Sequence, residues 1–147
     1  MRWLPIDLDP GVEVGQTGVF TRRSGFSATD AEVKAAVDLG QEITAWMEGE
    51  MGFSRAVRAF SGNGLHLMYR IPDLPNDAEH RELVKRAIGV IAAKFTSDRV
   101  DVDVKTVNPA RIWKLYGTTG RKGDSTPDRP HRRSYIYEGQ VLGLGEG

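Results

Sequence analysis

Two pairs of aspartates are the residues of this sequence whose type and spacing most directly suggest chemistry. Asp7 and Asp9 stand two residues apart in an apolar run, and Asp101 and Asp103 repeat this spacing in a valine-rich segment. Alternate residues of a strand point to one face, roughly 6.6 Å apart, so each pair can share a hard cation such as Mg²⁺ or Mn²⁺. Two such ions can activate an attacking hydroxyl and stabilise a leaving pyrophosphate. The alternative for each pair is a solvated strand end or strand face.

A histidine follows a glycine-rich turn in the middle of the chain. His66 alternates with Leu65 and Leu67, which places it opposite the apolar face of a strand-like run. The preceding Ser61-Gly62-Asn63-Gly64 offers backbone that can approach a phosphate closely and donate N–H groups. An ordinary surface histidine and a turn that only closes a hairpin are the alternatives.

Positive charge is concentrated in the C-terminal third of the chain. The formal net charge is zero, yet the stretch from Lys105 to Arg133 contains three Lys and five Arg against two Asp, a local charge of +6. Arg111 and Lys114 closely follow the second acidic pair, and residues 118–133 form a flexible basic loop that carries Arg121, Lys122, Arg129, Arg132 and Arg133. Such a loop beside an acidic metal site suits a polyphosphate and a nucleic-acid backbone. A solvated loop without a partner is the alternative.

The hydrophobic periodicity predicts the elements that must position these residues. We expect a helix over Asp30–Glu48, with Thr29 and Glu32 as a capping box, and a second helix that starts at Asn76. A long mobile loop is expected over Gly11–Ser27. Strands are expected at Trp3–Leu8, Arg55–Phe60, Leu65–Ile71, Val100–Val107, Ile112–Tyr116 and Ser134–Tyr137. This order predicts an α+β fold, in which two helices cover one face of a mainly antiparallel sheet.

Length and composition limit the function classes. The 147 residues suit one domain, and the absence of cysteine excludes a disulfide scaffold, thiol catalysis and a cysteine-based zinc site. No apolar run approaches eighteen residues, and the N-terminus lacks the apolar core of a signal peptide. We therefore expect a cytoplasmic protein without a membrane partner.

Three strings, taken together and in order, carry a family resemblance. They are Ile6-Asp7-Leu8-Asp9-Pro10, then Ser61-Gly62-Asn63-Gly64-Leu65-His66-Leu67, then Val102-Asp103 with Asn108-Pro109-Ala110-Arg111 following. They resemble the three motifs of the archaeo-eukaryotic primase superfamily, above all its primase-polymerase branch from phages, plasmids and other mobile elements. The resemblance spans nearly the whole chain, residues 1–147. The second string combined with Asn-Pro-Ala-Arg is specific, whereas each Asp-x-Asp is weak alone.

The resemblance implies roles for individual residues. Asp7, Asp9 and Asp103 match the catalytic metal ligands, and Asp101 is the less favoured acid. His66 matches the histidine that contacts the phosphates of the incoming nucleotide. The remaining implied nucleotide-binding residues are Ser61, Asn63, Gly64, Arg111 and Lys114.

The resemblance also implies an activity and its partners. The family's reaction is template-directed nucleotidyl transfer with two divalent ions, Mg²⁺ or Mn²⁺, used for primer synthesis or DNA chain extension. Its sheet is an RNA-recognition-like module. The implied partners are a single-stranded DNA template, NTP or dNTP, and a replicative helicase or a fused helicase domain. A non-catalytic nucleotide- or nucleic-acid-binding module of the same fold is the alternative. A replication-initiator endonuclease would need paired histidines near an acceptor tyrosine, a pattern that this sequence does not show.

Two departures from the family pattern bear on the site. Many relatives have a serine two residues before the second-motif histidine, and Gly64 stands there in this chain, which predicts weaker phosphate affinity. Relatives also carry a sizeable stretch before the first motif, whereas Asp7 is six residues from the start of this sequence. We therefore expect the catalytic core without the upstream module that helps to hold template.

Overall fold

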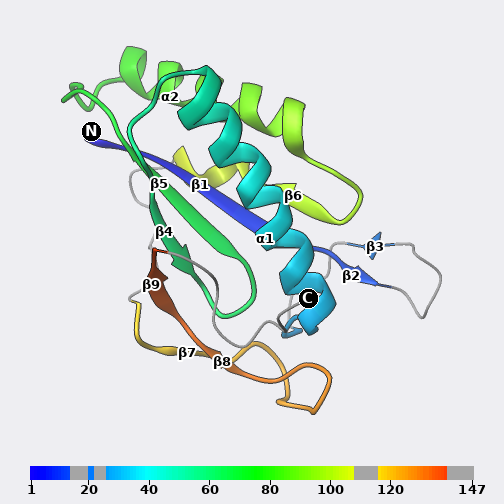
Figure 1. Cartoon of the computed structure of the whole chain (residues 1–147). Helices are drawn as coiled ribbons and strands as arrows, with labels where there is room; N and C mark the ends of the chain where they lie inside the picture. Colours follow the sequence, from blue (N-terminus) through cyan, green and yellow to red (C-terminus); the bar gives the residue numbers. More distant parts are fainter. Residues whose placement is uncertain (14–19, 22–25, 108–115, 139–147) are drawn as a thin grey trace.

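The computed structural model describes residues 1–13, 20–21, 26–107 and 116–138. A five-stranded sheet in the order β6-β1-β5-β4-β9 forms its centre, and every neighbouring pair of strands is antiparallel. The strands of this sheet are β1 Trp3–Pro10, β4 Val57–Phe60, β5 Leu65–Arg70, β6 Val100–Val102 and β9 Tyr135–Tyr137. Helices α1 (Asp30–Thr44) and α2 (Ala78–Phe95) cover one face (Figure 1). The predicted α+β class with a mainly antiparallel sheet is confirmed.

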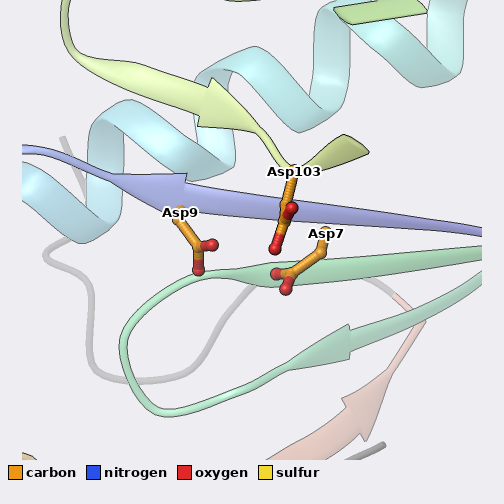
Figure 2. A group of neighbouring side chains, drawn as sticks. All are labelled: Asp7, Asp9 and Asp103. Atoms are coloured by element: carbon orange, nitrogen blue, oxygen red, sulfur yellow. The ribbon is translucent and has the colours of Figure 1, made fainter. Parts of the chain in front are cut away.

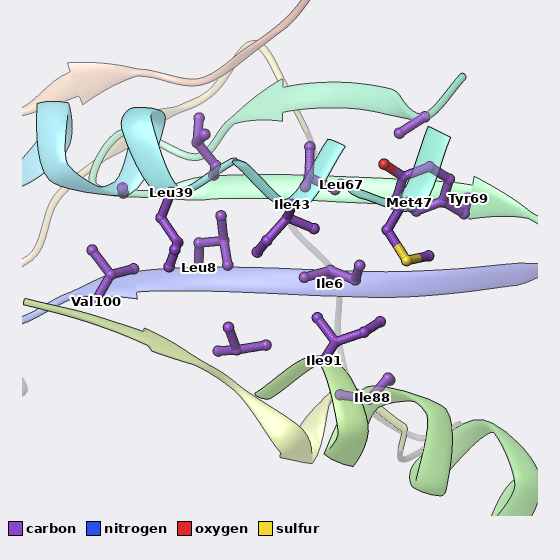
Figure 3. Close-up of a cluster of buried hydrophobic side chains, with 14 of the residues drawn as sticks. Ile6, Leu8, Leu39, Ile43, Met47, Leu67, Tyr69, Ile88, Ile91 and Val100 are labelled. Atoms are coloured by element: carbon purple, nitrogen blue, oxygen red, sulfur yellow. The ribbon is translucent and has the colours of Figure 1, made fainter. Parts of the chain in front are cut away.

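Alternation along β1 separates the core from the candidate site. Leu4, Ile6 and Leu8 are buried against the helices, whereas Asp7 and Asp9 belong to the opposite face. Strand β5 follows the same division, because Leu65 lies opposite Leu8 in the register. Figure 3 shows side chains of both helices packed against β1. Burial of each large aliphatic side chain stabilises the fold by about 1.5–3 kcal/mol, so the register of β1 is strongly fixed.

Helix α1 begins as predicted but ends differently. Thr29 is the N-cap, and its hydroxyl accepts the backbone N–H of Glu32 at 3.2 Å. The return bond of the predicted capping box, from the Thr29 backbone N–H to the Glu32 side chain, is not formed. The Glu32 carboxylate instead accepts a hydrogen bond from the Thr29 hydroxyl and pairs with Arg129. The predicted helix over Asp30–Glu48 is present, but its last part is not α-helical: α1 ends at Thr44, and the π-helix η1 (Ala45–Glu50) continues directly from it.

The π-helix places an acid over the helix-covered face of the sheet. Glu48 accepts the Tyr69 hydroxyl at 2.9 Å and forms an ion pair with Arg58 at 3.2 Å. Tyr69 is fully buried, and this burial, together with the hydrogen bond to Glu48, raises the pKa of its hydroxyl. These contacts connect η1 to β4 and β5.

The start of helix α2 lies one residue later than predicted from the sequence. Asp77, not Asn76, is the N-cap, and its carboxylate accepts the backbone N–H of His80 at 2.9 Å. A carboxylate at this position also interacts favourably with the helix dipole, which an asparagine cannot match. The hydrogen bond from the His80 backbone lowers the pKa of Asp77. Farther along, Val84 and Ile88 bury the apolar face of α2.

The predicted strand Val100–Val107 is wrong beyond Val102. Asp103 accepts the backbone N–H of Lys105 at 2.8 Å, and this local bond turns the chain into the 3₁₀ helix η2 (Val104–Val107). The alternation that placed the valines on one face therefore stops, and Val104 is exposed. The side chain of Asp103 is thus positioned by a turn.

The remaining strands are short. β2 (Val12–Glu13) pairs with β3 (Phe20–Thr21) inside the expected Gly11–Ser27 loop, and β7 (Thr119–Gly120) pairs with β8 (Arg132–Arg133). The predicted strand Ile112–Tyr116 lies outside the described residues except for Tyr116, which is in a turn. The predicted Ser134–Tyr137 strand is present as β9.

Candidate metal centre

Three carboxylates from β1 and the end of β6 meet on the sheet face opposite the helices. Asp7, Asp9 and Asp103 each offer one oxygen, and these oxygens all lie within 4.8 Å of one another. Figure 2 shows the three side chains directed toward one region. Asp7 and Asp103 are buried, and Asp9 is half-buried. Grouped carboxylate oxygens are the donor set that Mg²⁺ and Mn²⁺ prefer, so these residues fit a divalent cation.

Backbone pairing explains why Asp103 joins the group. Its N–H donates to the carbonyl oxygen of Asp7 at 2.9 Å, which continues the β1–β6 ladder by one step. Asp101 lies opposite Asp9 in the register but does not belong to the three-carboxylate group found among the described residues. The structure therefore brings together the three acids that the resemblance selected.

His66 lies directly beside this group. The register of β1 and β5 places it opposite Asp7, and its Nε2 is 3.3 Å from Oδ1 of Asp7. Its Nδ1 is 2.7 Å from the hydroxyl of Tyr116, and the His66 side chain is only 8% exposed. Sequence reasoning missed Tyr116, because a turn fifty residues from His66 in the chain has no periodic signal that points to β5.

Several polar atoms of the Ser61–Gly64 turn form hydrogen bonds to other parts of the protein or within the turn. The Ser61 hydroxyl accepts the N–H of Gly64 at 2.9 Å, and the Ser61 N–H donates to the Gly64 carbonyl at 2.9 Å. The Asn63 side chain accepts the N–H of Ala28 just before α1, at 2.8 Å. Gly62 has a φ of 102°, which favours glycine. These contacts give the turn a structural role at the entry to β5.

Gly64 lies against the strand that carries the acids. A Cβ at this position would overlap the carbonyl oxygen of Leu8 and would be 3.2 Å from both the Leu8 carbonyl carbon and Cδ of Pro10. Leu8 stands between Asp7 and Asp9. A serine at this position would meet the same obstacle, since β1 occupies the space of the side chain.

The arginines of the basic segment fall into two groups. Arg129 pairs with the buried Glu32 at 2.6 Å and also donates to the Ser27 carbonyl. Arg132 pairs with Asp30 at 2.6 Å and donates to the Ala28 carbonyl. These bonds fasten residues 118–133 to the N-terminus of α1. Arg133 donates to the Gly117 carbonyl, and Arg121 and Lys122 are exposed.

Two predicted phosphate-binding residues, Arg111 and Lys114, lie outside the described residues. The structure thus brings together the acidic group and His66 among the predicted site residues.

No protein-family model, no curated protein and no solved structure matches the chain. Among the described residues, no helix has the length and apolar character needed to cross a membrane.

Proposed function

We propose that this protein is a metal-dependent nucleotidyltransferase, with the RNA-recognition-like core of a primase-polymerase from the replication system of a mobile element. The observation that carries the proposal is the group formed by Asp7, Asp9 and Asp103, with His66 beside it. Each of these residues comes from one of the three strings that resemble the superfamily's motifs, and the strings are far apart in sequence. A chance resemblance gives no reason for the four side chains to meet at one point.

The proposed reaction is the attack of a chain's 3′-hydroxyl on the α-phosphate of an incoming nucleotide. A bond forms between the hydroxyl oxygen and the α-phosphorus, and the hydroxyl proton passes to solvent water. The bond from this phosphorus to the bridging β-phosphate oxygen breaks, and pyrophosphate leaves. Two Mg²⁺ or Mn²⁺ ions would supply the positive charge that activates the hydroxyl and stabilises the leaving group. Asp7, Asp9 and Asp103 would hold these ions on the rigid end of β1 and the adjoining turn. His66 would donate a hydrogen bond from Nε2 to a carboxylate or phosphate oxygen.

Template and nucleotide would approach the sheet face that carries Asp7, Asp9 and Asp103. The exposed arginines and lysines of 118–133 that could contact a single-stranded DNA backbone are Arg121, Lys122 and Arg133, since Arg129 and Arg132 bond to the N-terminus of α1. A replicative helicase, as a separate protein or a fused domain, is the proposed functional partner. Cytoplasmic location belongs to the same proposal.

Nucleotide incorporation on single-stranded DNA tests the proposal. The assay is run with and without an annealed primer, with NTP and dNTP, in Mg²⁺ and in Mn²⁺, and the Asp7→Ala/Asp9→Ala protein is the control. Product that the double variant fails to make supports nucleotidyl transfer, and the unprimed arm shows whether chains can start. A folded wild-type protein that binds Mn²⁺ and nucleotide but gives no product in any arm would favour the non-catalytic binding module instead.

A further inference from the structure

The sheet face that carries the acids continues along β1 as an apolar surface. Alternation along this strand places Trp3 and Pro5 on the same face as Asp7. Met68 on β5 lies opposite Pro5 in the register, and Val57 on β4 lies opposite Met68. Pro5, Val57 and Met68 are half-buried, whereas Trp3 is 45% exposed. Beyond the acids, this face therefore offers apolar contacts that end at an exposed indole.

The indole of Trp3 is held in place before any partner binds. The carbonyl of the preceding residue, Arg2, accepts the backbone N–H of Ile71 at 3.0 Å, and Trp3 itself lies opposite Arg70 in the β1–β5 register. The Arg70 guanidinium carbon lies 5.8 Å from the centre of the indole ring, a cation–π contact that favours one orientation of the ring. A ring that is ordered in advance loses little conformational entropy when another ring stacks on it.

Two arginines give this end of the sheet a positive charge. Arg2 and Arg70 each place a guanidinium nitrogen 3.2 Å from the same carboxylate oxygen of Asp73, and all three side chains are largely exposed. Two cations thus share one anion, and one positive charge is left unbalanced. Exposed ion pairs contribute little to stability, so either arginine can exchange Asp73 for a phosphate group.

An ordered aromatic ring beside exposed arginines has the chemistry that single-stranded nucleic acid requires, because every base has a face that stacks and every linkage has a phosphate. We propose that Trp3 stacks on a base of bound single-stranded DNA and that Arg2 and Arg70 contact its phosphates. This inference rests on the proposed function, since it states where the DNA strand of that reaction lies. Trp3 and Asp7 are four steps apart along β1, about 13 Å, so a strand that reacts at the acids reaches Trp3 within a few nucleotides.

The first test measures binding of fluorescein-labelled oligo(dT) by anisotropy, without metal ion or nucleotide. Trp3→Leu keeps an apolar side chain but removes the ring, and it should weaken binding by about fivefold to a hundredfold, the range for loss of one stacked base. Trp3→Phe keeps a ring and should retain most of the affinity. Leu83→Ala is the matched control, because it truncates a similarly exposed apolar side chain on α2, and its affinity should equal that of the wild-type protein. Equal affinities of Trp3→Leu and wild type would overturn the proposal.

The second test separates stacking from a general disturbance of the sheet. On an oligomer of the same length that carries phosphates but no bases, Trp3→Leu should bind as wild type does, and an equal loss on both oligomers would overturn stacking. Oligo(dT) should also quench the tryptophan emission of the wild-type protein, which has three tryptophans. Trp3→Phe should lose part of this quench while it still binds, and an unchanged quench would show that DNA does not contact Trp3.

The arginines are tested through salt dependence. Arg2→Gln removes one exposed cation, so the slope of log affinity against log salt should become shallower by about 0.7, whereas Trp3→Leu should leave the slope unchanged. An unaltered slope in Arg2→Gln would overturn the phosphate contact of Arg2.

These outcomes are distinguishable from failure of the proposed function. The binding measurements need no catalysis, so a wild-type protein that shows the Trp3 effect but incorporates no nucleotide would overturn nucleotidyl transfer alone. A wild-type protein that incorporates nucleotide, together with a Trp3→Leu protein of unchanged affinity, would overturn the role of Trp3 alone.

Discussion

Gly64→Ala is a single methyl addition that should disturb the packing of β1 against the turn before β5. The new Cβ would overlap the Leu8 carbonyl oxygen and stand 3.2 Å from Cδ of Pro10. A carbon and a carbonyl oxygen in contact are ordinarily about 3.3–3.6 Å apart, so β1 or the turn must move by about 1 Å. The atoms in the way are backbone of a central strand, which cannot turn aside as a flexible side chain can.

The expected cost follows from this rigidity. Overpacking typically costs about 1–3 kcal/mol. Because the obstacle here is backbone, we expect Gly64→Ala to lower the free energy of unfolding by about 3 kcal/mol. For a chain of this length that lowers Tm by about 6–12 °C. Because Leu8 separates Asp7 from Asp9, the same displacement should also weaken Mn²⁺ binding.

Two other glycines provide matched controls in urea unfolding followed by circular dichroism. A Cβ at Gly89 in α2 meets nothing within 4 Å, so Gly89→Ala should stabilise the protein by about 0.5–1 kcal/mol through helix propensity. A Cβ at Gly40 in α1 meets the ends of two flexible side chains, Leu65 at 2.8 Å and Leu8 at 3.5 Å, so Gly40→Ala should fall between the two. If Gly64→Ala were as stable as Gly89→Ala, the close approach of β1 to this turn would be refuted.

Three further variants probe contacts away from the acids. Tyr69→Phe removes the hydroxyl that donates to Glu48 and should cost about 2 kcal/mol in urea unfolding at neutral pH. The pKa of this hydroxyl is raised above the ordinary 10.0 in the folded protein, so its contribution to the free energy of unfolding should be fully present below pH 10.0 and be lost as the pH rises further. If the stability of Tyr69→Phe fell as steeply above pH 10.0 as that of the wild-type protein, the Tyr69 hydroxyl would not be the cause. Arg129→Met leaves the buried Glu32 without its arginine and should cost about 3 kcal/mol, whereas Arg121→Ala/Lys122→Ala should leave stability unchanged. If Arg121 and Lys122 make the proposed DNA contacts, the double variant should bind single-stranded DNA with a weaker salt dependence. The steepness of log affinity against log salt should fall by about 0.7 for each cation removed, and an unaltered slope would show that other residues bind the strand.

The parts of the site that sequence could predict are those governed by alternation within strands. Asp7 and Asp9 had to leave the core face, because Leu4, Ile6 and Leu8 occupy it, and His66 follows the same rule on β5. The meeting of Asp7 with His66 is a matter of register, which local pattern alone does not fix.

The parts that sequence could not predict depend on bonds between distant segments or on turns. The turn at Asp103 ends a valine-rich strand that periodicity extends to Val107, because one side-chain bond to the Lys105 N–H overrides strand propensity. The roles of Arg129 and Tyr116 likewise come from contacts across the fold, 97 and 50 residues away in sequence. Charge alone suggested a nucleic-acid contact for Arg129, and only the structure shows the buried carboxylate that it neutralises.

Incorporation of a labelled nucleotide by Asp103→Asn and Asp101→Asn, assayed side by side in Mn²⁺, tests the central claim most directly. Both variants remove one charge from the same short stretch, but only Asp103 belongs to the three-carboxylate group. Asp103→Asn should reduce incorporation by about a hundredfold or more, since a metal ligand contributes several kcal/mol to phosphoryl transfer, while Asp101→Asn should retain most of the wild-type rate. Equal rates for Asp103→Asn and the wild-type protein would contradict the assignment of this group as the catalytic metal site.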